Sequence, residues 1–397
     1  MLNRTLFSLA LTMLMLSSVM TVEAYGQSTT LVTAKDLSYL GSFKVPVLPG
    51  DGLSYGGSAL AFNSVNNSLY VVGHVYDQLT AELAIPQLGA TATVIQPLTD
   101  SVGGKLSSVA PGDQVRIGGN LVYKNRLYVS AFDYYDGNGT QTLSHFSRPL
   151  TLSTNTVTGP YRVGPMGAGF YDGYMSSIPS DWQARLGGPA LTGNCCISVI
   201  SRTSYGPAAF SFDPEKPSAN AQALVYYDSN HTTLGAYGAS GSHPLFNGTT
   251  SITGVFFPPG TASVLFFGST GIGNYCYGES AACGDPLGGS ADKGDHAYPY
   301  KAYIWAYNAS DLAAVRSGSR QPWEVTPYAT WELNQFVNVS PSDATGGAAY
   351  DPATGRLYLS QRSGDGDLPL IHVYKVNVGA VNVGLVQPMP PTNVQVQ

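Results

Sequence analysis

Histidine, tyrosine and acidic residues gather in a few segments that separate short apolar stretches. In the longest of these segments, residues 268–301, Asp295 and His296 are adjacent and tyrosines flank them. A histidine beside an aspartate can act as a general base, and aromatic rings next to it can form the wall of a binding site. A connection of this length predicts a lid or a binding loop. The alternative is that Asp295 caps a turn and that His296 packs beneath the loop.

Carboxylates occur in several of the other segments. Glycosidases use one carboxyl group as an acid and a second as a base or nucleophile, and Asp77, Asp133 and Asp172 offer such groups. His74 follows an apolar stretch, where it either transfers protons or satisfies a strand carbonyl. The predicted catalytic residues are Asp295, His296, His74, Asp77 and Asp133.

Other polar and aromatic side chains in these segments suit substrate binding. The guanidinium of Arg202 either holds a substrate carboxylate in a bidentate manner or bridges two parts of the sheet. The predicted substrate-binding residues are Arg202, Tyr205, His231, Tyr298, Arg362 and Trp182.

The segment 363–367 resembles part of a calcium loop, with Asp365 and Asp367 as candidate ligands. It lacks the later bidentate Glu of an EF-hand. A looser calcium site and a plain acidic turn are the two alternatives. Beyond this the sequence requires no cofactor, and it contains no Gly-x-Ser-x-Gly elbow, phosphate-binding loop or His-Glu-x-x-His motif.

A repeated pattern must position these side chains. Each copy has a glycine or glycine pair, a short apolar strand, a tight turn and a second apolar strand, and third and fourth strands follow. The copies begin at Gly56-Gly57, Gly118-Gly119, Gly187-Gly188, Gly254 and Gly346-Gly347.

The last copy lacks a fourth strand after Ile371 to Val376, and the segment Leu37 to Val45 can supply it. An N-terminal strand in that place closes a ring and removes exposed sheet edges. We therefore predict an all-β, five-bladed β-propeller closed by the N-terminal strand. Six or seven blades stay open as alternatives, because the third copy is poorly patterned. Ser180 to Leu186 and Ser310 to Val315 are the predicted short helices.

In such a blade the loop between the second and third strands lies on the same face as the crossover to the next blade. Nearly all of the candidate residues above fall in these two classes of loop. Functional residues concentrate on loops that a rigid scaffold holds, so the pattern predicts one central site on one face.

The N-terminus reads as an export signal. Arg4 precedes the apolar run Leu6 to Met20, and Val22-Glu23-Ala24 is a small-residue cleavage pattern. We expect a signal peptide at 1–24, a propeller at 36–377, a Pro-containing tail at 378–397, and a secreted or periplasmic location. The net charge of −6 without a basic cluster argues against nucleic acid or a membrane as partners.

Four cysteines are present, and in an exported protein they are expected to form disulfides. Cys276 and Cys283 suit a small closed loop, which leaves Cys195 and Cys196 to pair with each other or to remain free. Cross-pairing is an open alternative, and a zinc site is the weaker one.

On its blade pattern, the chain resembles secreted bacterial β-propellers of the carbohydrate-active type. The resemblance implies an exported polysaccharide- or glycoside-degrading enzyme, with a hydrolase favoured slightly over a lyase. The alternative is a non-catalytic carbohydrate-binding or scaffold propeller. The expected partner is a polysaccharide or oligosaccharide, and the expected state is a monomer.

Overall fold

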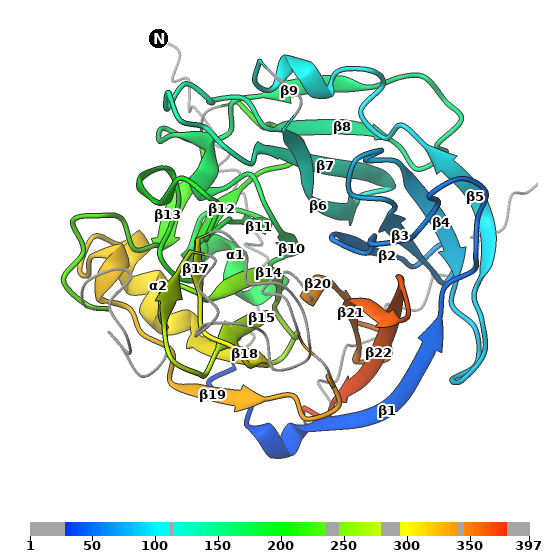
Figure 1. Cartoon of the computed structure of the whole chain (residues 1–397). Helices are drawn as coiled ribbons and strands as arrows, with labels where there is room; N and C mark the ends of the chain where they lie inside the picture. The colour runs from blue at the N-terminus through cyan, green and yellow to red at the C-terminus, as the bar shows by residue number, and fades with distance from the viewer. Residues whose placement is uncertain are drawn as a thin grey trace, which may run out of the picture.

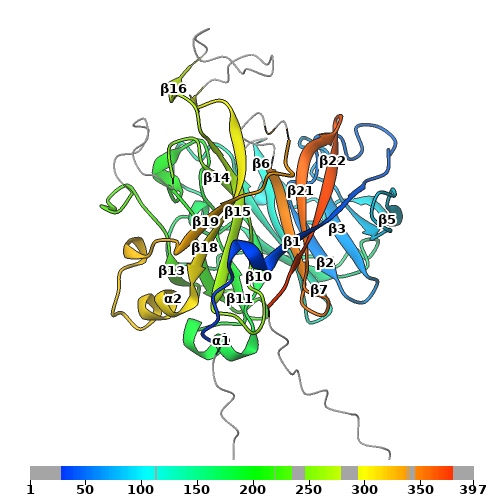
Figure 2. The ribbon, with the colours of Figure 1, turned by 90° about the horizontal axis from the view of Figure 1, so that it is seen from below.

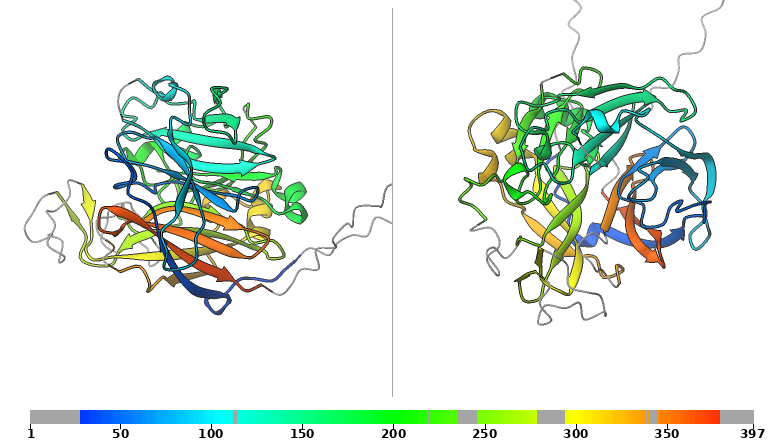
Figure 3. Two further views of the ribbon diagram at one scale, coloured as in Figure 1. Left: turned by 90° about the vertical axis from the view of Figure 1, so that its right-hand side faces the viewer. Right: turned by 45° about the horizontal axis from the view of Figure 1, so that its top comes forward.

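The computed structural model describes residues 28–111, 114–218, 220–234, 246–278, 294–337, 339 and 345–378. The predicted signal peptide and nearly all of the predicted tail lie outside the described residues. Within them, five four-stranded antiparallel sheets are arranged as blades around an axis (Figure 1; Figure 3, right). The prediction of a five-bladed β-propeller is confirmed.

Each of the first three blades takes its four strands consecutively from the chain. Their bounds are β2 (Leu60–Asn63), β3 (Ser68–Val72), β4 (Thr80–Ala84), β5 (Thr93–Thr99), then β6 (Val115–Tyr123), β7 (Arg126–Asp133), β8 (His145–Pro149), β9 (Thr158–Tyr161), then β10 (Met175–Ser177), β11 (Ala190–Thr192), β12 (Ala209–Phe212) and β13 (Gln222–Val225).

The fourth blade carries an extra hairpin, and the fifth combines both ends of the described chain. The fourth blade contains β14 (Ser251–Phe256), β15 (Ser263–Gly271), β18 (Tyr300–Asn308) and β19 (Ala329–Glu332), with β16 (Cys276–Tyr277) and β17 (Asp295–His296) as the hairpin; the fifth contains β20 (Thr345–Asp351), β21 (Arg356–Asp365), β22 (Leu368–Val376) and β1 (Leu37–Lys44). Short 3-10 turns lie at Ala34–Asp36, Leu106–Ser108, Ala168–Phe170, Ile200–Arg202 and Pro322–Glu324.

The ring closes through β1, which pairs antiparallel with β22. The register runs from Leu37 opposite Val376 to Lys44 opposite Leu370, with one irregularity between Tyr39 and Gly41. Figure 1 shows β1 along the outer side of β22. The first strand of the chain is thus the outermost strand of the last blade, as the missing fourth strand of that copy predicted.

The third blade corrects the predicted start of its copy. Its inner strand is β10, which follows Gly173, and Gly187 instead ends the helix α1 (Ser180–Leu186) with a left-handed backbone φ of 88°. A glycine in that conformation is the usual helix C-cap. Both α1 and α2 (Ala309–Arg316) were predicted as helices, but α1 lies inside the third blade, between β10 and β11, and not before it.

At the glycine positions of the inner strands, neighbouring blades approach one another so closely that a side chain does not fit there. A Cβ on Gly119 would collide with the carbonyl oxygen of Gly173, and a Cβ on Gly346 with that of Gly57. This close backbone approach explains why glycine marks the start of the copies.

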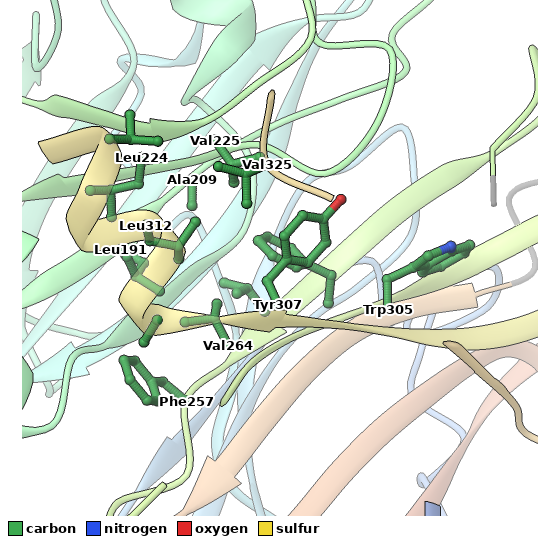
Figure 4. Packing of buried hydrophobic residues seen from close by; sticks show 14 of the residues in the cluster. Leu191, Ala209, Leu224, Val225, Phe257, Val264, Trp305, Tyr307, Leu312 and Val325 are labelled. Carbon is green, nitrogen blue, oxygen red and sulfur yellow. The ribbon is translucent and has the colours of Figure 1, made fainter. Parts of the chain in front are cut away.

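The core lies between neighbouring blades. Figure 4 shows Val264 and Tyr307 of the fourth blade near residues of the third blade, and Leu312 of α2 and Trp305 belong to the same cluster. Aromatic and branched side chains from two sheets fill each such interface, so each blade depends on its neighbours for burial. No helix among the described residues combines the length and hydropathy that crossing a membrane requires.

Candidate functional site

The loops between second and third strands share one face, which we call the site face. Figure 2 shows β16 and the β21–β22 turn at one edge of the propeller and α1 at the opposite edge. Trp182 lies in α1, where it is buried, and its Nε1 donates a hydrogen bond of 2.8 Å to the carbonyl of Thr261. The prediction that Trp182 lies on the site face is therefore wrong, because the third copy begins earlier than its glycine pair indicated.

Exposed tyrosines mark the site face. Among the described residues, the tyrosines in the class of exposed large side chains are Tyr39 on the outer strand β1 and five on site-face loops: Tyr55, Tyr76, Tyr134, Tyr135 and Tyr277. Their exposed fractions run from 45% for Tyr55 to 78% for Tyr277. Tyrosine presents an apolar ring and a polar hydroxyl, which suits a surface that contacts a ligand with both characters.

Two of the predicted catalytic residues, His74 and Asp77, come together with Asp51. One potential ligand atom from each of the three lies within 4.8 Å of the other two. Asp51 belongs to the connection from β1 to β2, and the other two belong to the β3–β4 loop. We call this group the Asp–His–Asp cluster.

Backbone hydrogen bonds hold the two loops of this cluster together. The N–H of His74 donates to the carbonyl of Gly52 at 3.0 Å, and the N–H groups of Asp77 and Gln78 donate to the carbonyl of His74 at 3.1 and 3.0 Å. Gln78 has a left-handed φ of 54°. Its side chain accepts a hydrogen bond from the N–H of Ile117 in the next blade. The loop is therefore fixed at both ends.

Two aromatic rings lie next to the histidine of the cluster. The ring centroids of Tyr55 and Tyr76 lie 6.2 and 5.5 Å from that of His74. The hydroxyl of Tyr55 donates to Asp367 at 2.9 Å, a hydrogen bond that raises the pKa of this tyrosine. Arg362 donates to the carbonyl of Tyr55 at 2.9 Å. The last blade thus supports the loop that carries Asp51.

The two predicted substrate-binding arginines both contact neighbouring blades. The contact of Arg362 with Tyr55 joins the fifth blade to the first. The guanidinium of Arg202 lies against Gly139 of the second blade, where an added Cβ would stand 2.5 Å from Cζ. Arg202 thus packs against the second blade, and its Nε is buried without a hydrogen-bond partner among the described residues.

The other predicted residues of the second and third blades form separate groups. Asp133 Oδ1 accepts a hydrogen bond of 3.1 Å from the N–H of Tyr135, which is a turn contact. The rings of Tyr205 and His231 meet edge to face, with centroids 5.3 Å apart. Burial raises the pKa of Tyr205. This pair was predicted to bind substrate, and the structure brings its two members together.

In the fourth blade, Asp295 and His296 form β17, which pairs with β16. The hydroxyl of Tyr275 donates to Asp295, and burial together with that hydrogen bond raises the pKa of Tyr275. His296 is buried beside the ring of Tyr298, at a centroid distance of 5.4 Å, and its Nδ1 lies 3.0 Å from the carbonyl of Gly294. The burial matches the alternative in which His296 packs beneath the loop.

One of the disulfide pairings that the sequence left open is present in the structure. Cys195 and Cys196 form a disulfide with each other. Cys276 is also disulfide-bonded, and Cys283 lies outside the described residues.

The acidic turn at the end of the fifth blade has protein partners. Asp365 forms an ion pair with Lys44 at 2.8 Å, and Asp367 accepts a hydrogen bond from the hydroxyl of Tyr55. In the described part of the chain, no third metal-ligating side chain joins these two. Both carboxylates of this turn therefore have partners within the protein.

Buried polar groups lie at and near the axis of the propeller, and one of them, Asp172, is among the carboxylates that the sequence offered as candidates. Asp172 is fully buried, Asn194 donates to its Oδ1 at 2.7 Å, and burial raises its pKa well above the usual value. The amide of Asn120 and the hydroxyl of Thr253 line a small axial cavity and have no hydrogen-bond partner among the described residues. In the sequence, only the positions of Asn120 and Thr253 next to the inner-strand glycines could have indicated that their side chains lie at the axis.

Comparisons with known proteins gave matches among solved structures only. No protein-family description and no curated protein matches the sequence. Among solved structures, the native arabinanase Arb43A of Bacillus subtilis matches with 10% identity over 85% of this chain and 96% of that chain, at a TM-score of 0.44. The GH43 endo-arabinanase of Bacillus licheniformis matches with 11% identity over 82% and 94%, at 0.41.

A GH130 protein, from a family that contains glycoside hydrolases acting on β-1,2-mannosidic linkages, matches with 12% identity over 89% of this chain and 98% of that chain, at a TM-score of 0.42. Glucose dehydrogenases also match, at a TM-score of 0.35. The neighbours include carbohydrate-active propeller enzymes, and the similarity is one of fold alone, which does not assign an activity.

Proposed function

We propose that the protein is an exported carbohydrate-active enzyme that binds a polysaccharide or oligosaccharide across the site face and cleaves it there. The observation that carries the proposal is the set of five exposed tyrosines on the loops of this one face. A sugar ring presents apolar C–H groups on its faces and hydroxyl groups at its edge. Exposed tyrosine rings match both, because the ring stacks and the hydroxyl forms hydrogen bonds.

The Asp–His–Asp cluster is the proposed chemical centre. Asp51 and Asp77 are exposed, whereas His74 is buried and contacts the rings of Tyr55 and Tyr76. Two carboxylates about 5 Å apart are the arrangement of a retaining glycosidase. Carboxylates and an imidazole that converge on one point can also hold a cation that activates water or substrate. Either chemistry acts on a glycosidic bond that is bound across the tyrosines.

Hydrolysis is favoured over elimination. Elimination from a uronate needs a cationic side chain to neutralise the substrate carboxylate. Arg202 was the candidate for this role, and Arg362 is the other arginine predicted to bind substrate. Both instead contact neighbouring blades through Gly139 and the carbonyl of Tyr55. Their guanidinium groups support the loops, and this leaves the acidic side chains of the site face as the reactive groups.

The test is incubation of the mature protein with a panel of neutral and acidic polysaccharides. Two products are measured: new reducing ends, and the ultraviolet absorbance of unsaturated uronates. The proposal expects reducing ends without unsaturated product, and it expects Asp77→Asn to remove them while Asp133→Asn, a turn residue, keeps them. Unsaturated product would identify a lyase, and release that is equal in wild type and Asp77→Asn would contradict the proposed centre.

A non-catalytic carbohydrate-binding propeller is the second candidate, and the axial cavity favours it. The cavity leaves about 10 Å³ of free space, room for a single water, and no acidic side chain lines it. This axial cavity therefore has no room for a sugar ring and no carboxylate that could act on one. Binding of a polymer in affinity electrophoresis, with no product from any member of the panel, would decide for this function.

A further inference from the structure

We propose that Asp51, His74 and Asp77 bind a divalent transition-metal cation, with Zn²⁺ as the best fit. The proposal goes beyond carbohydrate cleavage, since the cation site exists whether or not the protein is an enzyme. It starts from the convergence of three ligand atoms of the kinds that metals prefer, within 4.8 Å of one another.

The three side chains meet without bonding to one another. His74 Nδ1 and Asp51 Oδ2 are 3.9 Å apart, which is too long for a hydrogen bond. Zinc lies about 2.0–2.2 Å from its nitrogen and oxygen ligands, so neighbouring ligand atoms in a tetrahedral site are about 3.4 Å apart. A shift of well under 2 Å in each exposed carboxylate would complete such a site around one ion.

The negative charge of the cluster favours binding of a cation. Asp51 and Asp77 are two carboxylates at short range, and in the described part of the chain neither forms an ion pair with a lysine or arginine. The guanidinium of Arg116 lies over the ring of Tyr76, 5.7 Å from its centroid. Lys44 is paired with Asp365. A bound divalent ion would offset the repulsion between the two carboxylates.

The imidazole is held ready for a metal. His74 is 9% exposed, and its backbone N–H and C=O are fixed by Gly52, Asp77 and Gln78. Its Nδ1, the nitrogen 3.9 Å from Asp51 Oδ2, accepts only one long hydrogen bond, 3.4 Å from the N–H of Tyr76. A buried imidazole that keeps a nitrogen for a ligand is the most common kind of metal donor.

The donor set selects the class of ion. One nitrogen and two carboxylate oxygens suit zinc or manganese, whereas calcium and magnesium prefer oxygen donors alone. Three protein ligands leave coordination positions open, as in catalytic zinc sites. The side chain of Asp51 is 70% exposed, so these positions face solvent and the tyrosines of the site face. Water or a sugar hydroxyl group can occupy them.

Isothermal titration calorimetry on the EDTA-treated mature protein tests the site. Separate titrations use Zn²⁺, Mn²⁺ and Ca²⁺ without any carbohydrate, so the result does not depend on enzymatic activity. We expect one Zn²⁺ per chain, and at least tenfold weaker binding in His74→Gln and in Asp77→Asn. Asp133→Asn and Asp365→Asn are matched controls, because their carboxylates lie on the same face outside the cluster, and they should bind as wild type does.

Circular dichroism of each variant separates loss of the site from loss of the fold. A second measurement, the visible spectrum of the Co²⁺-loaded protein, should show the bands of a low-coordinate site in wild type and lose them in His74→Gln. Binding of Ca²⁺ alone, no binding of any of the three ions, or Zn²⁺ binding that survives in both cluster variants would overturn the proposal.

Discussion

The N–H of Gly347 donates a hydrogen bond of 2.9 Å to the carbonyl of Gly57. This contact joins the inner strand of the last blade to the segment that leads into the first, beside the axis. It complements the pairing of β1 with β22 at the outer edge. The ring is therefore closed at both its inner and its outer circumference, and the site-face loops are fixed by a closed scaffold.

The first prediction concerns this inner ring. Gly347→Ala places a Cβ against the backbone of Leu60 and 2.7 Å from Cα of Ala59, where only backbone could move aside. We expect a loss of about 1–3 kcal/mol in the free energy of unfolding. Gly167→Ala is the matched control, because its φ is −58° and nothing lies within 4 Å of the added Cβ. Equal midpoints in urea for the two variants would contradict the close approach.

The second prediction concerns Glu82, which is buried in the first blade. Burial by itself raises its pKa, but hydrogen bonds from Ser68, Gln96, Asn66 and Asn63 together hold the pKa below the usual value. A lowered folded-state pKa gives stability that is present above the unfolded pKa and is lost as the pH falls through the folded one. Glu82→Gln should cost about 1–3 kcal/mol at pH 7.

The same variant should also flatten the acid dependence of stability. Urea unfolding between about pH 3 and 7, where carboxyl groups titrate, measures both the loss of stability at pH 7 and the change in its acid dependence. An unchanged slope in Glu82→Gln would show that the folded carboxylate does not titrate below its unfolded value.

The third prediction concerns two buried histidines. Burial lowers the pKa of His145 to about 3 and that of His372 to about 4. Both imidazoles are hydrogen-bonded, His145 to Ser144 and Thr192 and His372 to Tyr39 and Gln361. Their C2–H signals should stay constant in an NMR titration from about pH 8 to 5.

Because these two pKa values are depressed in the folded state, the unfolded chain takes up protons first. Stability should be full above the unfolded histidine pKa of about 6.5 and should fall by up to a few kcal/mol as the pH drops toward 4. A titration midpoint near 6.5 for either signal would show that the imidazole is accessible to water.

The fourth prediction concerns sugar binding. Tyr76 is 76% exposed beside His74, and Tyr76→Ala should weaken binding of the preferred oligosaccharide two- to tenfold, about what one aromatic contact contributes. Tyr39→Ala removes an exposed tyrosine from the outer strand β1 and should leave affinity unchanged. A loss of affinity in Tyr39→Ala that matches the loss in Tyr76→Ala would move the binding surface away from the site face.

The sequence predicted the architecture because local patterns determine it. The last copy lacks a fourth strand after Val376, and the strand that begins at Leu37 belongs to no other copy. The number of strands in each copy was therefore enough to predict that these two ends of the chain pair. The third blade failed for a local reason as well: β10 has only three residues and no alternation, while Gly187 serves the helix. Two different uses of glycine look the same in sequence.

The site was predicted less completely, because it depends on contacts between loops. His74 and Asp77 are three residues apart and could be singled out together, but their partner Asp51 comes from an earlier loop that a backbone hydrogen bond holds in place. Arg202 and Trp182 carry suitable side chains whose partners, Gly139 and Thr261, lie in other blades. Contacts of this kind between different loops and blades depend on tertiary packing, and no local pattern in a single sequence predicts them.

Hydrogen–deuterium exchange of the mature protein, with and without an oligosaccharide from the panel that binds, tests the account most directly. We predict protection of the peptides that cover residues 50–56 and 73–79, with no change in α1 on the opposite face. Protection confined to α1 or to the outer strand β1, with these two loops unaffected, would contradict the assignment of carbohydrate to the face that carries Asp51, His74 and Asp77.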